Sequence, residues 1–179
     1  MSPFARTWMT AGLALAAAFG WIQGCRAADT TSAGPALLAR YFADVNAHDV
    51  DALKDVIAAD YVQHDADQGR GLEGMQAAFR RYFEMFPDFH WTLEDSIVAN
   101  DRVVARFQIT ATHDRTVQLG PNAPSFPPTG RKLVWQGISI WRVADGKFVE
   151  HWGVDDLLGL VQQMRVQPAT QPRQPQAPR

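Results

Sequence analysis

Residues 132–159 constrain the fold more strongly than any other segment of the chain. Two runs rich in β-branched and aromatic residues flank the dipeptide Asp145-Gly146, which suits the positive φ angles of a tight hairpin turn. The second run leads into an apolar stretch with helical spacing, from about Asp156 to Arg165. We therefore predict two long antiparallel strands followed by a closing helix.

The second strand of this hairpin places ionisable and small residues on one face. Because side chains alternate along a strand, His151, Gly153 and Asp155 share that face. A face that mixes large aromatic side chains with a few ionisable groups indicates a pocket wall. With a three-residue bulged turn, the preceding strand adds three residues to it: Trp135, Ser139 and Trp141.

A helix cap competes with function at the end of this strand. Either Asp155 or Asp156 suits the N-cap of the following helix, and only one of them is needed there. A shift of one residue in the strand register exchanges the faces on which the two lie. The sequence leaves open which of the two faces the pocket.

The first part of the domain is helical and the rest is strand-like. Apolar residues recur at helical spacing around Tyr41 and again around Phe79 and Phe83, whereas apolar and polar residues alternate after Pro87. Helices followed by a run of antiparallel strands predict an α+β domain, with the helices packed on one face of a curved sheet. Such a sheet can leave an apolar cavity between itself and the helices.

Two further histidines lie on segments that can face this cavity. His64 belongs to a short strand-like segment, and His113 falls on the apolar face of an alternating one. A lone histidine in a strand is more often a hydrogen-bonded structural residue than a catalyst, so both have a structural alternative. After His113, the Pro-rich residues 115–130 predict a long loop that can cover a pocket.

Both ends of the chain differ from the domain between them. Arg6 precedes an apolar run over residues 8–22, and residues 1–28 therefore predict an export signal to the periplasm or the medium. Lipidation of Cys25 would anchor the protein to a membrane, whereas cleavage after Ala27 or Ala28 would release it. Residues 167–179, rich in Pro and Gln, predict a disordered tail. The folded domain is then residues 32–166.

Charge and motif content exclude several classes of function. The formal net charge is −2 and no basic run occurs, which argues against a nucleic-acid partner. The single cysteine excludes an internal disulfide framework and a cysteine-rich zinc site. No Walker loop, dinucleotide fingerprint, nucleophile elbow or zinc-protease motif is present. We therefore expect no metal and no cofactor.

Short segments that occur in order along the domain carry a resemblance to a known family. They are Tyr41-Phe42 with Asn46 and Asp49, Asp60-Tyr61-Val62-Gln63-His64-Asp65, Pro87-Asp88-Phe89 with Trp91-Thr92, Arg102-Val103-Val104-Ala105-Arg106, Thr110-Ala111-Thr112-His113, Pro127-Pro128-Thr129-Gly130, and Asp145-Gly146-Lys147-Phe148-Val149-Glu150-His151-Trp152. Together they resemble the SnoaL-like polyketide cyclase, or ester cyclase, family over nearly all of residues 36–164. The resemblance implies the nuclear transport factor 2-like (cystatin-like) fold, a cone of curved antiparallel sheet with N-terminal helices and a short C-terminal helix around an apolar pocket. It also implies a homo-oligomer, which we expect to be a dimer.

The resemblance implies a site as well. In the family's cyclases, an Asp that acts as acid/base follows a His-Trp pair on the last strand, and a ring closes by intramolecular aldol condensation without metal or organic cofactor. Here Gly153 follows His151-Trp152, and Asp155 is the nearest substitute, about 7 Å further along the same face. Asp155, His151 and His64 are therefore the expected catalytic residues. The expected substrate-binding residues are His113, Trp135, Ser139, Trp141, Tyr41, Phe79 and Phe83.

Two functions are compatible with such a site. The first is an exported enzyme that binds a small hydrophobic carbonyl compound. In it, Asp155 would move a proton α to the carbonyl during an aldol-type cyclisation or an isomerisation. The second is a non-catalytic carrier or sensor of an apolar ligand, which Gly153 at the family's acid/base position favours.

Overall fold

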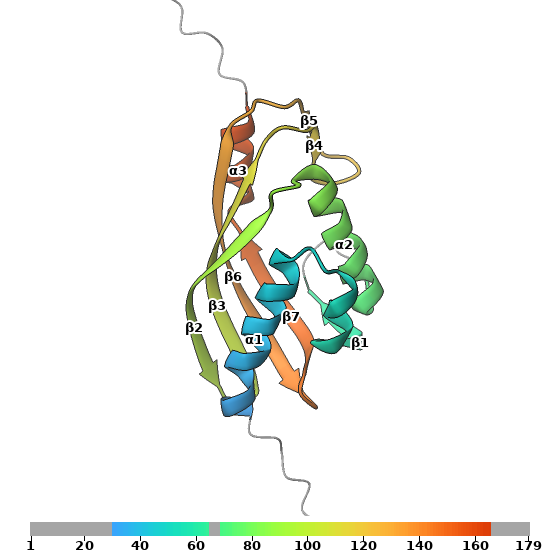
Figure 1. Cartoon of the computed structure of the whole chain (residues 1–179), viewed down its shortest axis with the longest axis vertical. Coiled ribbons are helices and arrows are strands. Elements are labelled where there is room, and N and C mark those ends of the chain that lie inside the picture. The colour runs from blue at the N-terminus through green and yellow to red at the C-terminus, as the bar shows by residue number, and fades with distance from the viewer. Residues whose placement is uncertain (1–29, 65–68, 166–179) are drawn as a thin grey trace, which may run out of the picture.

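The computed structural model describes residues 30–64 and 69–165 (Figure 1). The expected export signal, Cys25 and the expected tail lie outside these residues. Within the described residues, no helix is long and apolar enough to cross a membrane. The elements in chain order are α1 (Thr30–Asn46), the 3₁₀ helix η1 (Asp51–Asp55), β1 (Ile57–Gln63), α2 (Gly71–Met85), β2 (His90–Ala99), β3 (Arg102–Thr112), β4 (Val117–Gln118), β5 (Ser125–Phe126), β6 (Lys132–Ala144), β7 (Lys147–Asp155) and α3 (Leu157–Met164).

The predicted α+β architecture is confirmed. A curved five-stranded sheet has the strand order β1-β7-β6-β3-β2, and helices lie against one of its faces (Figure 1). The pairings among β2, β3, β6 and β7 are antiparallel, but the edge strand β1 runs parallel to β7. The Pro-rich segment differs from the expected plain loop, because it contains the small hairpin β4–β5, with Val117 and Phe126 buried.

The β6–β7 hairpin forms at the predicted turn but reaches its register in an unexpected way. Asp145 and Gly146 have φ angles of 50° and 73°, and two positive values in succession are what a two-residue hairpin turn of this kind requires. The pairing register then shifts between Arg142 and Val143. This strand irregularity, in place of a three-residue turn, brings the predicted residues of both strands onto one face.

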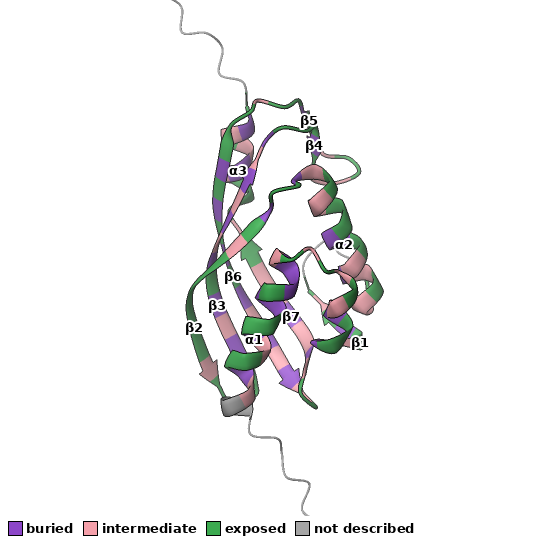
Figure 2. Cartoon of the chain, in the orientation of Figure 1, coloured by how far each residue is buried: buried purple, intermediate pink, exposed green. Residues whose placement is uncertain are grey.

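Aromatic side chains fill the centre of the space between the sheet and the helices. α1 packs on β2 and β3, α2 on β1, and α3 on β6, and Figure 2 shows buried residues on the strands behind α1. The core is therefore centred on Tyr41, which is 2% exposed. Its ring centroid lies 5.7–6.2 Å from those of Phe42, Phe79, Trp91, Trp141 and Phe148.

Candidate functional site

His151 projects from β7 into the covered face of the sheet. It is 8% exposed, and its ring lies 5.1 Å from that of Trp141, the residue opposite it on β6. His151 Nδ1 donates a hydrogen bond of 3.0 Å to Oε1 of Gln63, its register partner on β1. Because an amide oxygen only accepts, this bond makes Nε2 the acceptor nitrogen of the neutral ring. A histidine whose Nδ1 is held by a neighbouring side chain in this way has the arrangement expected of a general base.

Gly153 provides the space in which the His151 ring lies. A Cβ atom at position 153 would be 2.8 Å from His151 Cε1, 3.1 Å from His151 Nε2 and 3.0 Å from Ser139 Oγ. These distances are shorter than the roughly 3.5–4.0 Å of a favourable contact between carbon atoms. The imidazole and the buried hydroxyl therefore converge above Gly153. The position at which the resemblance implies an acid/base residue is thus a glycine, and the His151 ring occupies the space that a side chain would need.

A second glycine, Gly137, provides the space that the Asp155 carboxylate occupies. Gly137 lies opposite Asp155 on β6, and a Cβ atom there would overlap Asp155 Oδ1 and lie 2.6 Å from Phe107 Cζ. The carboxylate and the Phe107 ring therefore both lie close to Gly137, approaching it from the two neighbouring strands. Gly137 and Gly153 are diagonal neighbours across the strand pair, a relation that separates two residues by about 7 Å. One patch of the inner face thus carries a carboxylate and an imidazole.

The cap of α3 distinguishes Asp155 from Asp156. Asp156 Oδ1 accepts a hydrogen bond of 2.8 Å from the Gly159 amide, and Asp156 is the N-cap residue of α3. Asp155 is the last residue of β7 and is paired with Gly137. The capping alternative therefore applies to Asp156, and Asp155 shares the face of His151.

The expected inward orientation of His64 is wrong. Its ring stacks on Trp152 at a centroid distance of 4.7 Å, and its Nε2 donates to Glu150 Oε1 at 2.9 Å. Glu150 and Trp152 flank His151 along β7, so their side chains lie on the opposite face of the sheet. On β1 it is Gln63 that points inward, and His64 lies on the outer face.

His113 is held by the Pro-rich segment that follows it. It is fully buried, its Nε2 donates to the Phe126 carbonyl at 3.3 Å, and the Thr129 hydroxyl donates to its Nδ1 at 3.0 Å. The amides of Thr129 and Gly130 also donate to the His113 carbonyl. These contacts fasten residues 126–130 to the end of β3, and they place His113 in a structural role apart from His151.

Four predicted binding residues pack in the aromatic core. Trp135 lies on the inner face and packs against Phe86, with ring centroids 5.8 Å apart. Tyr41 and Phe79 are 6.2 Å apart, and Phe83 stacks on Phe79 at 5.7 Å. The neighbours of Trp135, Tyr41 and Phe79 are further aromatic rings, which is the packing of a protein core. Phe83 lies at its edge, where it is half-buried and stacks on His48 at 3.9 Å.

Trp141 is a predicted binding residue that carries a buried hydrogen-bond donor left unsatisfied by the described residues. It is 1% exposed, and its indole Nε1 is a buried donor for which the described residues supply no acceptor. A buried donor without an acceptor costs about 1–3 kcal/mol. Trp141 lies against His151 and Tyr41, so this donor belongs to a residue that borders the imidazole.

Sequence reasoning missed Gln63 and Gly137. The alternation of β1 contained a signal for the first, because the apolar Tyr61 must face inward and Gln63 shares its side of the strand. The signal for Gly137 was its place inside a strand that is otherwise β-branched and aromatic, because a glycine there marks a point where another group approaches the backbone closely.

The chemistry that this patch can perform is proton transfer. It offers an oriented imidazole, a hydroxyl group, a carboxylate and an indole donor on a largely buried surface. Within the described part of the chain, no three His, Cys, Asp or Glu side chains are grouped so that they could hold a metal ion.

Fold and site together define an α+β cone of the nuclear transport factor 2-like type. The sequence model of the SnoaL-like polyketide cyclase family matches residues 36–164, and the chain belongs to that family. A comparison with curated protein sequences gave no match.

Solved structures with the same fold include proteins with different descriptions. TsrD from Streptomyces laurentii has a TM-score of 0.65 and 31% identity, covering 74% of this chain and 95% of that chain. IdmH from Streptomyces antibioticus, a candidate polyketide cyclase, has a TM-score of 0.61 and 28% identity, covering 73% and 96%. AclR from Streptomyces galilaeus, a candidate hydroxylase, has a TM-score of 0.64 and 26% identity, covering 75% and 96%. Because one fold serves several chemistries, the reaction has to be argued from the site.

Proposed function

We propose that this SnoaL-like domain binds a small hydrophobic carbonyl compound and catalyses proton transfer next to the carbonyl, leading to an aldol-type cyclisation or an isomerisation. The observation that carries the proposal is the bond from His151 Nδ1 to Gln63, which orients the imidazole above Gly153, beside the Ser139 hydroxyl. A positioned base of this kind contributes typically about 10²–10⁴-fold to a proton transfer.

His151 and Asp155 have different roles in the proposed proton transfer. His151 Nε2 removes the proton α to the carbonyl, and the Asp155 carboxylate over Gly137 stabilises the imidazolium that forms. In a cyclisation, the enolate carbon then forms a bond to a second carbonyl carbon of the same substrate. The imidazolium returns its proton to the alkoxide oxygen produced. The proton removed is thus restored, and the reaction needs no oxidant or reductant.

Two donors can receive the carbonyl oxygen as negative charge develops on it. The Ser139 hydroxyl lies beside the His151 ring above Gly153, and the Trp141 indole N–H is buried with no acceptor among the described residues. A substrate oxygen would remove the cost of that unsatisfied donor. Donors aimed at developing charge contribute more in a site that excludes water than they do in solution.

Hydrogen–deuterium exchange tests the proposed chemistry without knowledge of the natural substrate. The full chain is incubated in D₂O with a panel of hydrophobic β-keto esters, and NMR follows loss of the α-proton signal. We expect His151→Gln to slow exchange at least about 100-fold. Asp156→Asn, which retains an N-cap side chain, is the control and should match the wild type. Exchange that persists in His151→Gln would contradict the role of His151.

A carrier or sensor function is the second candidate. The dense packing around Tyr41 favours it, because a filled interior leaves less room for a reacting substrate. Native mass spectrometry of protein purified from its own host would detect a retained small molecule. A compound that stays bound and unchanged, together with no exchange of any β-keto ester, would support the carrier over the enzyme.

We further propose that the protein is exported, either lipidated on Cys25 or released by cleavage. The support is the basic start and apolar run of residues 1–28. Fractionation of cells that express the full chain, with radiolabelled palmitate, distinguishes the two routes. If lipid anchors the protein, Cys25→Ser should move it from the membrane to the soluble fraction and remove the label. An unlabelled protein outside the cytoplasm would favour cleavage, and a cytoplasmic one would contradict export.

A further inference from the structure

A group of polar and aromatic side chains lies on the outer face of the sheet, directly behind His151, and the proposed mechanism does not use it. His64 stacks on Trp152 with an interplanar angle of 4°. Its Nε2 donates to Glu150 Oε1 at 2.9 Å, and Arg142 Nε donates to Glu150 Oε2 at 2.7 Å. The Trp152 ring also contacts Arg102, whose Cζ lies 4.8 Å from the ring centroid. These contacts link the end of β1 to β7 and β6, and Arg102 extends them to β3.

The outer group and the inner site share the same short piece of backbone. His64 follows Gln63, and Glu150 and Trp152 flank His151. The His64 amide donates to the His151 carbonyl at 3.0 Å. A change in the position of His64 therefore moves Gln63, and with it the oxygen that orients the His151 ring.

Backbone pairing alone holds this end of β1 weakly. β1 is the edge strand, and its pairing with β7 is irregular between Ile57 and Val62. Register is resumed only at Val62 and Gln63, the last residues of the strand. Edge strands with few ladder bonds open more readily than central ones, so side-chain contacts at this end of β1 add to the backbone pairing that places Gln63.

From these contacts we infer that His64 is a positioning residue: by binding Glu150 and stacking on Trp152, it holds the end of β1 so that Gln63 keeps the His151 ring in its reactive orientation. The dependence resembles that of metal-binding histidines on the groups that hold their second nitrogen. Glu150 is suited to the task because hydrogen bonds from Arg142 and His64 keep its pKa below the usual range. The inference rests on the proposed function for its kinetic consequence alone.

The state of the His151 ring tests the inference directly. A ¹H–¹⁵N NMR spectrum of the histidine side chains reports which ring nitrogen carries the proton and how fast that proton exchanges with water. In His64→Ala we expect the His151 Nδ1 proton to exchange at least about 10-fold faster, and kcat for α-proton exchange to fall about 10-fold with KM unchanged. His64→Gln retains an N–H donor for Glu150 and should restore most of both quantities.

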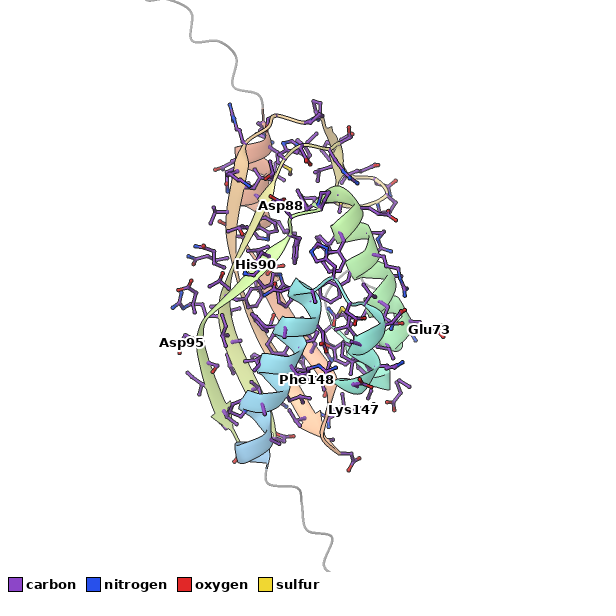
Figure 3. The ribbon with its side chains drawn as sticks, in the orientation of Figure 1. Glu73, Asp88, His90, Asp95, Lys147 and Phe148 are labelled. Carbon is purple, nitrogen blue, oxygen red and sulfur yellow. The ribbon has the colours of Figure 1, made fainter. Side chains whose placement is uncertain are left out.

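His90→Ala is the matched control, because His90 is an exposed histidine on β2, far along the sheet from β1 (Figure 3). It should leave the His151 ring and the kinetics unchanged. Circular dichroism verifies that each variant is folded. A His151 ring that behaves in His64→Ala as in the wild type would overturn the inference. If even the wild type fails to exchange α-protons, the proposed function fails, while the ring spectra still decide the role of His64.

Discussion

The absence of a side chain at Gly153 is what lets the His151 ring lie close to the backbone at position 153. In Gly153→Ala the new Cβ would meet His151 Cε1 at 2.8 Å and Ser139 Oγ at 3.0 Å. We expect the ring to swing away from Gln63, with a loss of about 1–3 kcal/mol in the free energy of unfolding and at least about a 10-fold loss of α-proton exchange. Urea unfolding and NMR exchange measure the two effects.

Gly120→Ala is the control for that substitution. A Cβ atom at position 120 would lie 3.9 Å from the nearest side-chain atom, Ala123 Cβ, an ordinary van der Waals distance. The variant should therefore match the wild type in stability and activity. Equal behaviour of Gly153→Ala and Gly120→Ala would show that the histidine does not depend on the space above Gly153.

The site was predictable from the sequence to the extent that strand alternation is reliable. His151, Ser139, Trp141 and Asp155 lie on one face as predicted, because an Asp-Gly turn and two long alternating runs fix the faces of a hairpin. His64 was misplaced because β1 is short and mixes polar with apolar residues on both sides. The fully buried Tyr61 is the residue that fixes its alternation.

Asp88 lies in the turn between α2 and β2 (Figure 3), and its side chain joins this turn to the ends of β3 and β6. Its carboxylate accepts from the Thr112 amide at 2.7 Å and from Lys132 Nζ at 3.1 Å. Partial burial acts to raise the pKa of Asp88, but hydrogen bonds from Thr112 and Lys132 outweigh it and lower the pKa to about 2. A carboxylate with a lowered pKa stabilises the fold above its unfolded-state pKa, and that contribution is lost as pH falls toward 2.

Asp88→Asn should therefore destabilise the protein at pH 7 and matter progressively less in acid. We expect a loss of about 1 kcal/mol at pH 7, reduced by solvent screening because the side chain is 45% exposed. Urea unfolding of wild type and variant at several pH values between 7 and 2.5 measures the difference. Asp95→Asn, at an exposed position on β2 (Figure 3), is the control. A difference that stays constant down to pH 2.5 would contradict this account of Asp88.

Elements set by local signals were predicted, whereas those set by distant pairing were not. The two N-terminal helices, the hairpin and the closing helix follow from apolar spacing, Pro87 and Asp145-Gly146. The parallel pairing of β1 with β7 and the register shift at Arg142 depend on contacts between remote segments. The same holds for β4–β5, whose Val117 and Phe126 are buried in the core and whose Phe126 carbonyl accepts from His113.

The outer face of the sheet carries a patch of exposed apolar side chains. Ile97, Val104, Ile140 and Trp152 lie in register across four strands. Ile138 and Val154, paired with each other on the central strands, are 52% and 76% exposed. Exposed apolar patches of this kind mark interaction sites. On the same face, Arg106 and Arg142 form ion pairs with Glu94 and Glu150 of their own chain, and most soluble homo-oligomers are two-fold dimers.

We therefore propose a homodimer that forms through this face, and predict that one charge at its centre abolishes it. Val154→Lys would place an ammonium group where a stable interface excludes water, and a stable interface buries about 800 Å² on each partner. Sedimentation velocity should give a dimer for the wild type and a monomer for Val154→Lys. Leu93→Lys adds the same charge at another exposed apolar residue, 40% exposed on the edge strand β2, and should remain dimeric.

Because His64 and Trp152 lie on this face, dimer formation would also shield the pair that holds Gln63, so Val154→Lys should speed exchange of the His151 ring proton. A monomeric wild type, or a dimer that survives Val154→Lys, would contradict the proposed interface.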